Sequence, residues 1–176
     1  MRKIIEDEKK IKIEKLKKEK VIDILDEMFE IISSNMSSII DTGNSKEEDY
    51  KNWKNSMLKE LDNPNKNWIG AFKDNKLIGY FLYKINDHSI NLDEIQVKKS
   101  HQGDKHTFIK LFKYILNEDK IDDSFDVLTY VNNNNNKSNE IVKKFGFEVL
   151  ERKERGIKYI NSFKKLREEL ECYVIK

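Results

Sequence analysis

Gly103 lies between a stretch that alternates like a β-strand and a stretch with the apolar spacing of a helix. The first N–H groups of a helix have no partners inside it, so a sharp strand-to-helix turn suits an anion, and phosphate above all. Asp104, Lys105, His106 and Thr107 follow, where a tight phosphate-binding turn often has more glycine. Two interpretations remain open: a phosphate site, in which the Lys105 ammonium helps to hold the anion, or an ordinary polar turn.

Two consecutive carboxylates, Asp93 and Glu94, precede this turn on the same expected strand. A carboxylate close to a reacting amine can act as a general base. Strict alternation predicts that Glu94 shares a face with Leu92 and Gln96. It places Asp93 on the opposite face, with Ile95. Glu94 is the favoured candidate for the base, and a solvated carboxylate on the strand surface is the alternative for each residue.

Other kinds of catalytic site find little support in the sequence. His88, His101 and His106 lack the companions that a metal site or a Ser/His/Asp triad needs, and we interpret them as surface residues. Cys172 is the only cysteine, so there is no disulfide framework, and a structural role is favoured over a nucleophilic one. We therefore expect no metal.

Length and charge limit the class of protein. The 176 residues suit a single domain, 1–176. The 34 basic and 32 acidic residues nearly cancel, which argues against nucleic-acid binding through a broad basic surface. The lysines of residues 1–20 have five acidic neighbours, which favours a solvated charged segment. The N-terminus has no apolar run of the length that a signal peptide or membrane span needs, so we expect a cytoplasmic protein without a membrane partner. We also expect a monomer or homodimer.

Apolar periodicity and turn signals predict the elements that must position these residues. Ser45 and Glu48 fit a capping box at a helix start, and the turn "KDNK" between two apolar runs predicts a β-hairpin. The expected elements in chain order are a strand at 10–16, helices at 21–32 and 45–61, a hairpin at 67–85, a strand at 89–97, a helix at 108–116, a strand at 126–131, a helix at 137–145, strands at 147–153 and 157–163, and a tail at 164–171.

That order, β-α-α-β-β-β-α-β-α-β-β, together with two short motifs, resembles the GCN5-related N-acetyltransferase (GNAT) family. In this family the strand before the turn typically ends in Val, as at Val97, and the turn begins with Gln or Arg and contains small residues. Gln102 and Gly103 fit this pattern, whereas Lys105 and Thr107 replace the two later small residues. The resemblance implies an α/β (α+β) fold with a mixed, mostly antiparallel central β-sheet flanked by helices.

The second motif is similar to the family's unit of an Asn, a helix and Gly-Phe. Counting back from Gly146 and Phe147 puts Asn135 at the Asn position. Val142 stands where many members have a tyrosine that can protonate the departing thiolate. Either the thiolate leaves without a side-chain acid, or another tyrosine, such as Tyr130 or Tyr159, reaches the sulfur.

The resemblance implies an acyl-CoA-dependent N-acetyltransferase that moves an acetyl group from acetyl-CoA to a primary amine of a small molecule or protein. Glu94 is the expected base. The coenzyme arm would pair with the strand at Ile95, Gln96 and Val97, and Asn135 would help to orient it or only cap a helix. The pyrophosphate would lie against the N–H groups of the turn, which are those of Gln102, Gly103, Asp104, Lys105, His106 and Thr107.

Two further alternatives remain open from the sequence. Lys105, Thr107 and Val142 also fit a catalytically degenerate binding or interaction module with the same fold. The acidic residues of the loop between the first two helices could favour a cationic acceptor, although an exposed acidic loop explains them more simply. These residues are Asp41, Glu47, Glu48 and Asp49.

Overall fold

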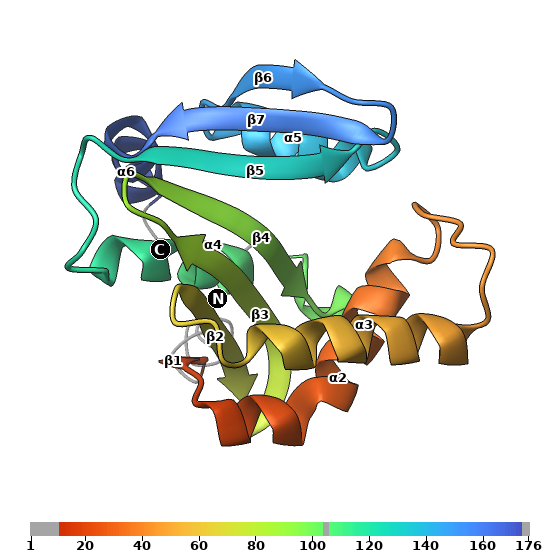
Figure 1. Ribbon diagram of the computed structural model, residues 1–176. Coiled ribbons are helices and arrows are strands. Elements are labelled where there is room, and N and C mark those ends of the chain that lie inside the picture. Colours follow the sequence, from red (N-terminus) through yellow and green to blue (C-terminus); the bar gives the residue numbers. More distant parts are fainter. Residues whose placement is uncertain (1–10, 104–105, 174–176) are drawn as a thin grey trace.

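The structure is a computed structural model that describes residues 11–103 and 106–173. Within these residues seven strands form one sheet in the order β1-β2-β3-β4-β5-β7-β6. The strands are β1 (Lys12–Lys15), β2 (Lys66–Lys73), β3 (Lys76–Ile85), β4 (Ser89–Val97), β5 (Asp126–Asn132), β6 (Glu148–Arg152) and β7 (Gly156–Ser162). All neighbouring strands are antiparallel except β4 and β5, which run parallel (Figure 1).

Helices cover both faces of this sheet. They are α2 (Lys18–Met36), α3 (Lys46–Glu60), α4 (His106–Lys113), α5 (Asn136–Lys144) and α6 (Phe163–Cys172), with short 3-10 helices η1 (Lys99–His101) and η2 (Tyr114–Asn117). The predicted capping box at the start of α3 is present, because the Ser45 side chain accepts from Glu48 N–H and the Glu48 carboxylate accepts from Ser45 N–H. The predicted hairpin is β2–β3, and its turn residues Asp74 and Asn75 both have positive φ, as a two-residue hairpin turn requires.

Two apolar cores lie on opposite faces of the sheet. On one face α2 buries Val21, Leu25 and Met28 against Trp68 and other residues of β2 and β3. On the other face residues of α4, α5 and α6 pack against the sheet, and the fully buried residues there include Ile69, Tyr83, Leu111, Tyr159 and Leu166. Strand β3 contributes alternate residues to both cores, so both of its faces are covered.

The predicted fold class and element order are confirmed, with one correction at the C-terminus. Residues 164–171, expected as a tail, belong to helix α6. Ser162 caps this helix by accepting a hydrogen bond from Lys165 N–H, and Phe163, Leu166 and Leu170 follow at helical spacing and are buried. Phe163, which was expected to end a strand, is the first residue of α6. Lys10, at the start of the predicted first strand, lies outside the described residues.

No helix in residues 11–103 and 106–173 has both the length and the apolarity needed to cross a membrane.

Candidate active site

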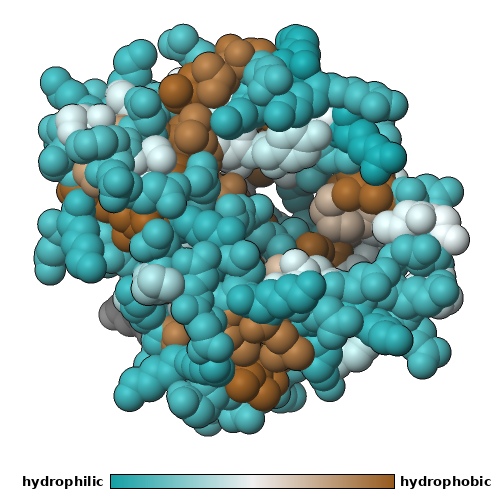
Figure 2. All heavy atoms as spheres, in the orientation of Figure 1, coloured by the Kyte–Doolittle hydropathy of each residue, from teal (hydrophilic) through white to brown (hydrophobic). Residues whose placement is uncertain are grey.

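The strands β4 and β5 pair only at one end. Ser89 to Leu92 pair with Asp126 to Thr129, and no further β4 residue pairs with β5. From there the two strands diverge (Figure 1), and the space-filling surface is hollowed where they part (Figure 2). The remainder of β4 therefore presents an open edge to this cleft.

A β-bulge in β4 begins where the pairing with β5 ends. Leu92 is opposite Tyr83 and Glu94 is opposite Leu82, so Asp93 is one extra residue without a counterpart on β3. A bulge bends its strand and disrupts the local ladder, which is consistent with the divergence of β4 from β5.

Because of the bulge, two residues of β4 lie on other faces of the sheet than strict alternation predicts. Glu94 shares a face with Gln96, as predicted, but Leu92 packs into the core on the opposite face. Asp93 does not share the face of Ile95, because its carboxylate contacts Lys66 and Lys84. The two consecutive carboxylates thus lie on the same side of the sheet, toward α2 and α3.

Glu94 accepts a hydrogen bond from the hydroxyl of Tyr80, a fully buried residue of β3. Glu94 is partly exposed as a residue, and desolvation of its carboxyl raises its pKa to about 7. The hydrogen bond from Tyr80 and the charge of Lys66 lower this pKa, while the charge of Asp93 raises it. A carboxylate with a pKa near neutrality can both take up and release a proton under physiological conditions.

Basic side chains balance the carboxylates beside Glu94. Lys66 is almost fully buried, forms an ion pair with Asp93, and lies over the ring of Trp68 at 5.6 Å from its centroid. Lys84 pairs with Glu60 at 2.9 Å and lies 3.9 Å from Asp93. Sequence reasoning missed Lys66 and Tyr80, because their position beside Glu94 depends on strand register and on the bulge.

The backbone at Ile95 and Val97 faces the open edge of β4. Lys98 N–H donates to Ile78 O on β3, and backbone groups alternate in direction along a regular strand. The N–H and C=O groups of Ile95 and Val97 therefore point away from β3, whereas those of Gln96 point toward it. In agreement with this, Val97 O accepts hydrogen bonds from two side chains outside the sheet, Asn35 and Gln102.

The turn after β4 is held by an amide network. Asn35, in the last turn of α2, donates to Gln96 Oε1 at 2.9 Å and to Val97 O at 3.0 Å. Gln102 donates to Asn35 Oδ1 at 3.1 Å and to Val97 O at 2.7 Å. From the other side of the cleft, Lys137 Nζ on α5 donates to Gln102 Oε1 at 2.9 Å. The role of Asn35 was missed because the segment reads as a helix end.

The remaining turn residues lead into α4. A Cβ added to Gly103 would meet no atom of the described residues within 4 Å, so no contact with that part of the chain requires a glycine there. Asp104 and Lys105 lie outside the described residues. His106 begins α4, and Thr107 is fully buried with no hydrogen-bond partner for its hydroxyl among the described residues.

Asn135 is the N-cap of α5, and its side chain accepts a hydrogen bond from Ser138 N–H at 3.0 Å. Its buried neighbour Asn139, which sequence reasoning did not single out, donates to Asn132 O and Asn135 O and accepts from Tyr159. The hydrogen bond from Ser138 fits the interpretation of Asn135 as a helix cap. Val142, further along α5, is partly buried against the core.

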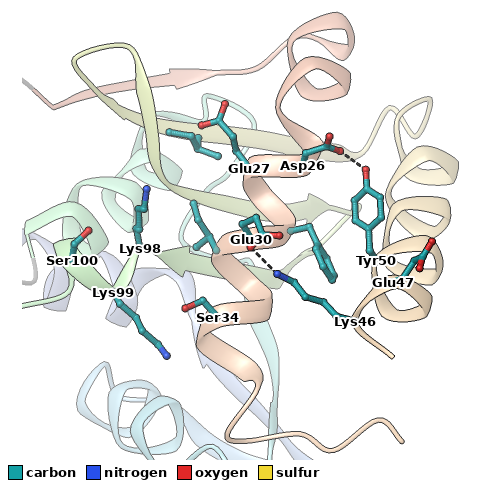
Figure 3. Close-up of a pocket in the computed structure, with 13 residues that line it drawn as sticks. Asp26, Glu27, Glu30, Ser34, Lys46, Glu47, Tyr50, Lys98, Lys99 and Ser100 are labelled. Carbon is teal, nitrogen blue, oxygen red and sulfur yellow. Dashed lines mark hydrogen bonds and ion pairs between the residues drawn. The ribbon is translucent and has the colours of Figure 1, made fainter. Parts of the chain in front are cut away.

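A separate groove of about 1110 Å³ lies over α2. Figure 3 shows Lys98, Lys99 and Ser100 on one side of this helix and Lys46, Glu47 and Tyr50 on the other. Glu94 does not line it. Of the acidic loop residues, Glu48 belongs to the capping box and Asp49 accepts from Thr42 and Asn44, which supports a structural role for these two.

The histidines do not form a metal site in the described part of the chain. No group of three or more His, Cys, Asp or Glu side chains in residues 11–103 and 106–173 is arranged to hold a metal ion. His88 packs against Phe125 and His101 contacts Ser100.

Comparisons with known proteins reveal relationships in structure alone. No protein-family model matches the sequence, and no curated protein matches it significantly. The PaiA N-acetyltransferase of Thermoplasma acidophilum, solved with coenzyme A, is 21% identical with a TM-score of 0.70, over 87% of this chain and 99% of that one. An acetyltransferase from Streptococcus agalactiae is 13% identical with a TM-score of 0.69, over 88% and 99%.

A third structure, the N-acetyltransferase PseH of Campylobacter jejuni, was solved with acetyl-CoA. It is 16% identical with a TM-score of 0.54, over 87% of this chain and 99% of that one. Each of these three alignments covers 87% or 88% of this chain. The chain therefore has the fold of the GNAT acetyltransferases.

Proposed function

We propose that this protein is an N-acetyltransferase that moves an acetyl group from acetyl-CoA to a primary amine of a small molecule or protein. The observation that carries the proposal is the open edge of β4, which runs from the carboxylate of Glu94 to the turn that begins α4. The coenzyme A and acetyl-CoA complexes of PaiA and PseH support it, because those proteins share the fold.

The residues fit a coenzyme arm. The N–H and C=O groups of Ile95 and the N–H of Val97 point into the cleft, where an amide-containing chain can pair with them as an added strand would. The carbonyl oxygen of Val97 is already engaged by Asn35 and Gln102. An N–H group on this edge, directed at the thioester carbonyl, would stabilise the negative charge that develops on its oxygen. The side chain of Gln96 contributes indirectly, by fixing Asn35 and so the end of α2.

The turn fits a pyrophosphate. The open space at Gly103 allows an anion to approach the backbone closely, and α4 begins shortly after it, so the first turn of this helix is directed at the same place. The N–H of Gln102, predicted to contact the pyrophosphate, already donates to Lys99 O at 3.3 Å, so we assign this role to the backbone of Gly103, Asp104 and Lys105, with the Lys105 ammonium as a further contact. Asn135 would act here by ordering the loop before α5.

Glu94 is proposed to be the general base. An alkyl amine has a pKa near ~10.4, so it must lose a proton before its nitrogen attacks. Glu94 takes that proton, the neutral amine nitrogen forms a bond to the thioester carbon, and the carbon–sulfur bond then breaks to release the coenzyme thiolate. The nitrogen loses its second proton as the amide forms, and this proton passes to the departing sulfur or to water. A thiolate of pKa near ~8.5 can leave without a side-chain acid, which is consistent with Val142.

Ligand binding and turnover test this proposal together. A ligand at about 100 times its dissociation constant adds ~2.7 kcal/mol to the free energy of unfolding, so acetyl-CoA should raise the melting temperature, whereas acetate should not. Release of free thiol with a panel of primary amines should follow, and Glu94→Gln should suppress it. A rise in melting temperature without turnover on any amine would favour the catalytically degenerate module. No rise in melting temperature would count against both the enzyme and the module as binders of acetyl-CoA.

A further inference from the structure

The hydrogen bond from Tyr80 to Glu94 joins the two longest strands of the sheet at the cleft. Tyr80 is opposite Gln96, and Glu94 lies two residues along β4 on the same face. The Tyr80 ring is fully buried in the core beneath α2, among residues such as Leu82 and Met28. A buried aromatic ring has little rotational freedom, so its hydroxyl is a fixed point on this side of the cleft.

We propose that Tyr80 is the positioning residue of the general base: its hydroxyl holds the Glu94 carboxylate in the orientation that accepts a proton from the acceptor amine. This inference rests on the proposed N-acetyltransferase function. A glutamate side chain has three rotatable torsions, and an ordered partner removes much of that freedom before the substrate binds.

Tyr80 remains a hydrogen-bond donor over the whole working pH range. Burial and the neighbouring charge of Glu94 raise the pKa of Tyr80 well above its ordinary value. The phenol therefore stays protonated and cannot replace Glu94 as the base. It stabilises the charged form of Glu94, because a hydrogen bond to an ionised acceptor is stronger than one to a neutral acceptor.

The other charged groups near Glu94 come from the strands beside it and from α3. Lys66 of β2 favours the ionised carboxylate, and Asp93 of β4 opposes it. Lys84 of β3 and Glu60 of α3 influence Glu94 only indirectly, because Lys84 pairs with Glu60 and approaches Asp93. Removing the Tyr80 hydroxyl leaves all of these charged groups in place, so the substitution isolates the effect of the Tyr80 hydrogen bond on the ionisation of Glu94.

The chain offers a matched control on the same strand. Tyr83 is also fully buried, and its hydroxyl donates to Glu118 Oε1 at 2.5 Å. This second phenol–carboxylate pair lies on the opposite face of the sheet, away from Glu94. Tyr83→Phe and Tyr80→Phe therefore remove the same group from equally buried sites, and only Tyr80→Phe changes the contacts of the proposed base.

The experiment compares kcat/KM for one accepted amine from pH 5.5 to 9.5 in the wild-type protein and the two variants. The ionisation of the amine is common to all three and cancels in the comparison. Tyr80→Phe should raise the apparent pKa of the acid limb by about one unit or more and should lower the plateau about tenfold. Tyr83→Phe should leave the profile of the folded protein unchanged. Identical profiles for Tyr80→Phe and Tyr83→Phe would overturn the proposal.

A second readout does not need activity. Proteins labelled with ¹³C at the glutamate carboxyl carbon report the titration of each side chain by NMR, and Glu94→Gln assigns the Glu94 signal. Its titration midpoint should move up in Tyr80→Phe and stay in place in Tyr83→Phe, and an unmoved midpoint in Tyr80→Phe overturns the pairing. A wild-type protein that turns over no acetyl-CoA would instead overturn the proposed function, so the two failures are distinguishable.

Discussion

The hydroxyl of Tyr159 on β7 donates a hydrogen bond of 2.9 Å to Asn139 Oδ1 on α5, and Tyr159 is fully buried. The amide of Asn139 in turn donates to the carbonyl oxygens of Asn132 and Asn135, both at 3.0 Å. This buried network ties the start of α5 to β5 and β7. The hydroxyl of Tyr159 is therefore engaged in the core, which argues against its reaching the coenzyme sulfur.

Tyr159→Phe should destabilise the protein without changing its chemistry. The substitution leaves a buried amide oxygen without a donor, which costs about 1–3 kcal/mol. Denaturant unfolding measures this loss, while kcat of the folded variant should stay within about twofold of wild type. Tyr130→Phe is the control, because Tyr130 is 49% exposed and should change stability by no more than about 0.5 kcal/mol. A large fall in kcat for Tyr159→Phe would restore it as a candidate acid.

Glu94→Gln should strongly reduce turnover and yet make the protein more stable at alkaline pH. The folded-state pKa of Glu94, about 7, is above its ordinary value of 4.5. The folded protein therefore binds more protons than the unfolded chain between these values, and the contribution of Glu94 to stability is lost as pH rises toward 7. Gln carries no charge and avoids this loss.

The difference in unfolding free energy between Glu94→Gln and wild type should thus grow by about 1–3 kcal/mol from pH 5 to pH 8. Urea unfolding at several pH values measures it, and every other titrating group is common to the two proteins. A difference that is flat across this range would mean that the carboxyl of Glu94 is well solvated. The loss of the proposed general base should reduce kcat by about 10² or more.

Gly103→Ala should weaken coenzyme binding and leave the fold intact. The added methyl group would meet no atom of residues 11–103 and 106–173 within 4 Å, and Ala restricts the unfolded chain, so stability should be unchanged or rise by about 0.4–1 kcal/mol. The methyl would lie in the path of a phosphate, so the Kd for acetyl-CoA should rise about tenfold. Isothermal titration calorimetry measures the affinity.

Gly43→Ala provides the opposite pattern as a control. Gly43 also has open space around it, but its φ of +69° disfavours a side chain. This variant should lose about 1 kcal/mol of stability and keep its affinity for acetyl-CoA. If Gly103→Ala bound the coenzyme as tightly as wild type, the phosphate assignment of the turn would fail.

Val142→Tyr and Val142→Phe test whether an acid is missing on α5. Both variants place a ring at a position that is partly buried against the core, so the pair isolates the effect of the hydroxyl. We expect equal kcat within about twofold, because a thiolate of pKa near ~8.5 can depart as the anion. A higher rate for the tyrosine variant in stopped-flow measurements of thiol release would show that proton delivery limits the native reaction.

Local signals in the sequence were sufficient for most of the fold. The capping box at Ser45, the hairpin turn at Asp74 and Asn75, and the apolar spacing of α2 each depend on residues close together in the chain. Helix α6 was missed because its apolar residues, Phe163, Leu166 and Leu170, are few among charged ones. The helix is recognisable only once its cap and its burial are known.

The site was only partly predictable. Glu94 and the turn at Gln102 could be proposed as site residues from the sequence, because strand position and a short motif point to them, and these assignments stay predictions. Tyr80, Lys66 and Asn35 could not, since each reaches the site across the sheet or from a distant helix. Alternation misplaced Asp93 and Leu92, because no local signal marks the bulge.

The extra residue in β4 also bears on how relatives of this chain can be compared. Without Asp93, β4 would alternate regularly against β3, with Leu92 and Glu94 still on their present faces and both apolar cores preserved. A relative that lacked this residue and had an uncharged side chain in place of the buried Lys66 would keep the fold, but its straighter β4 would stay paired with β5 along its length, with no open edge for a thioester. In an alignment, such a loss of catalytic capacity would be visible only as a gap of a single position and one substitution.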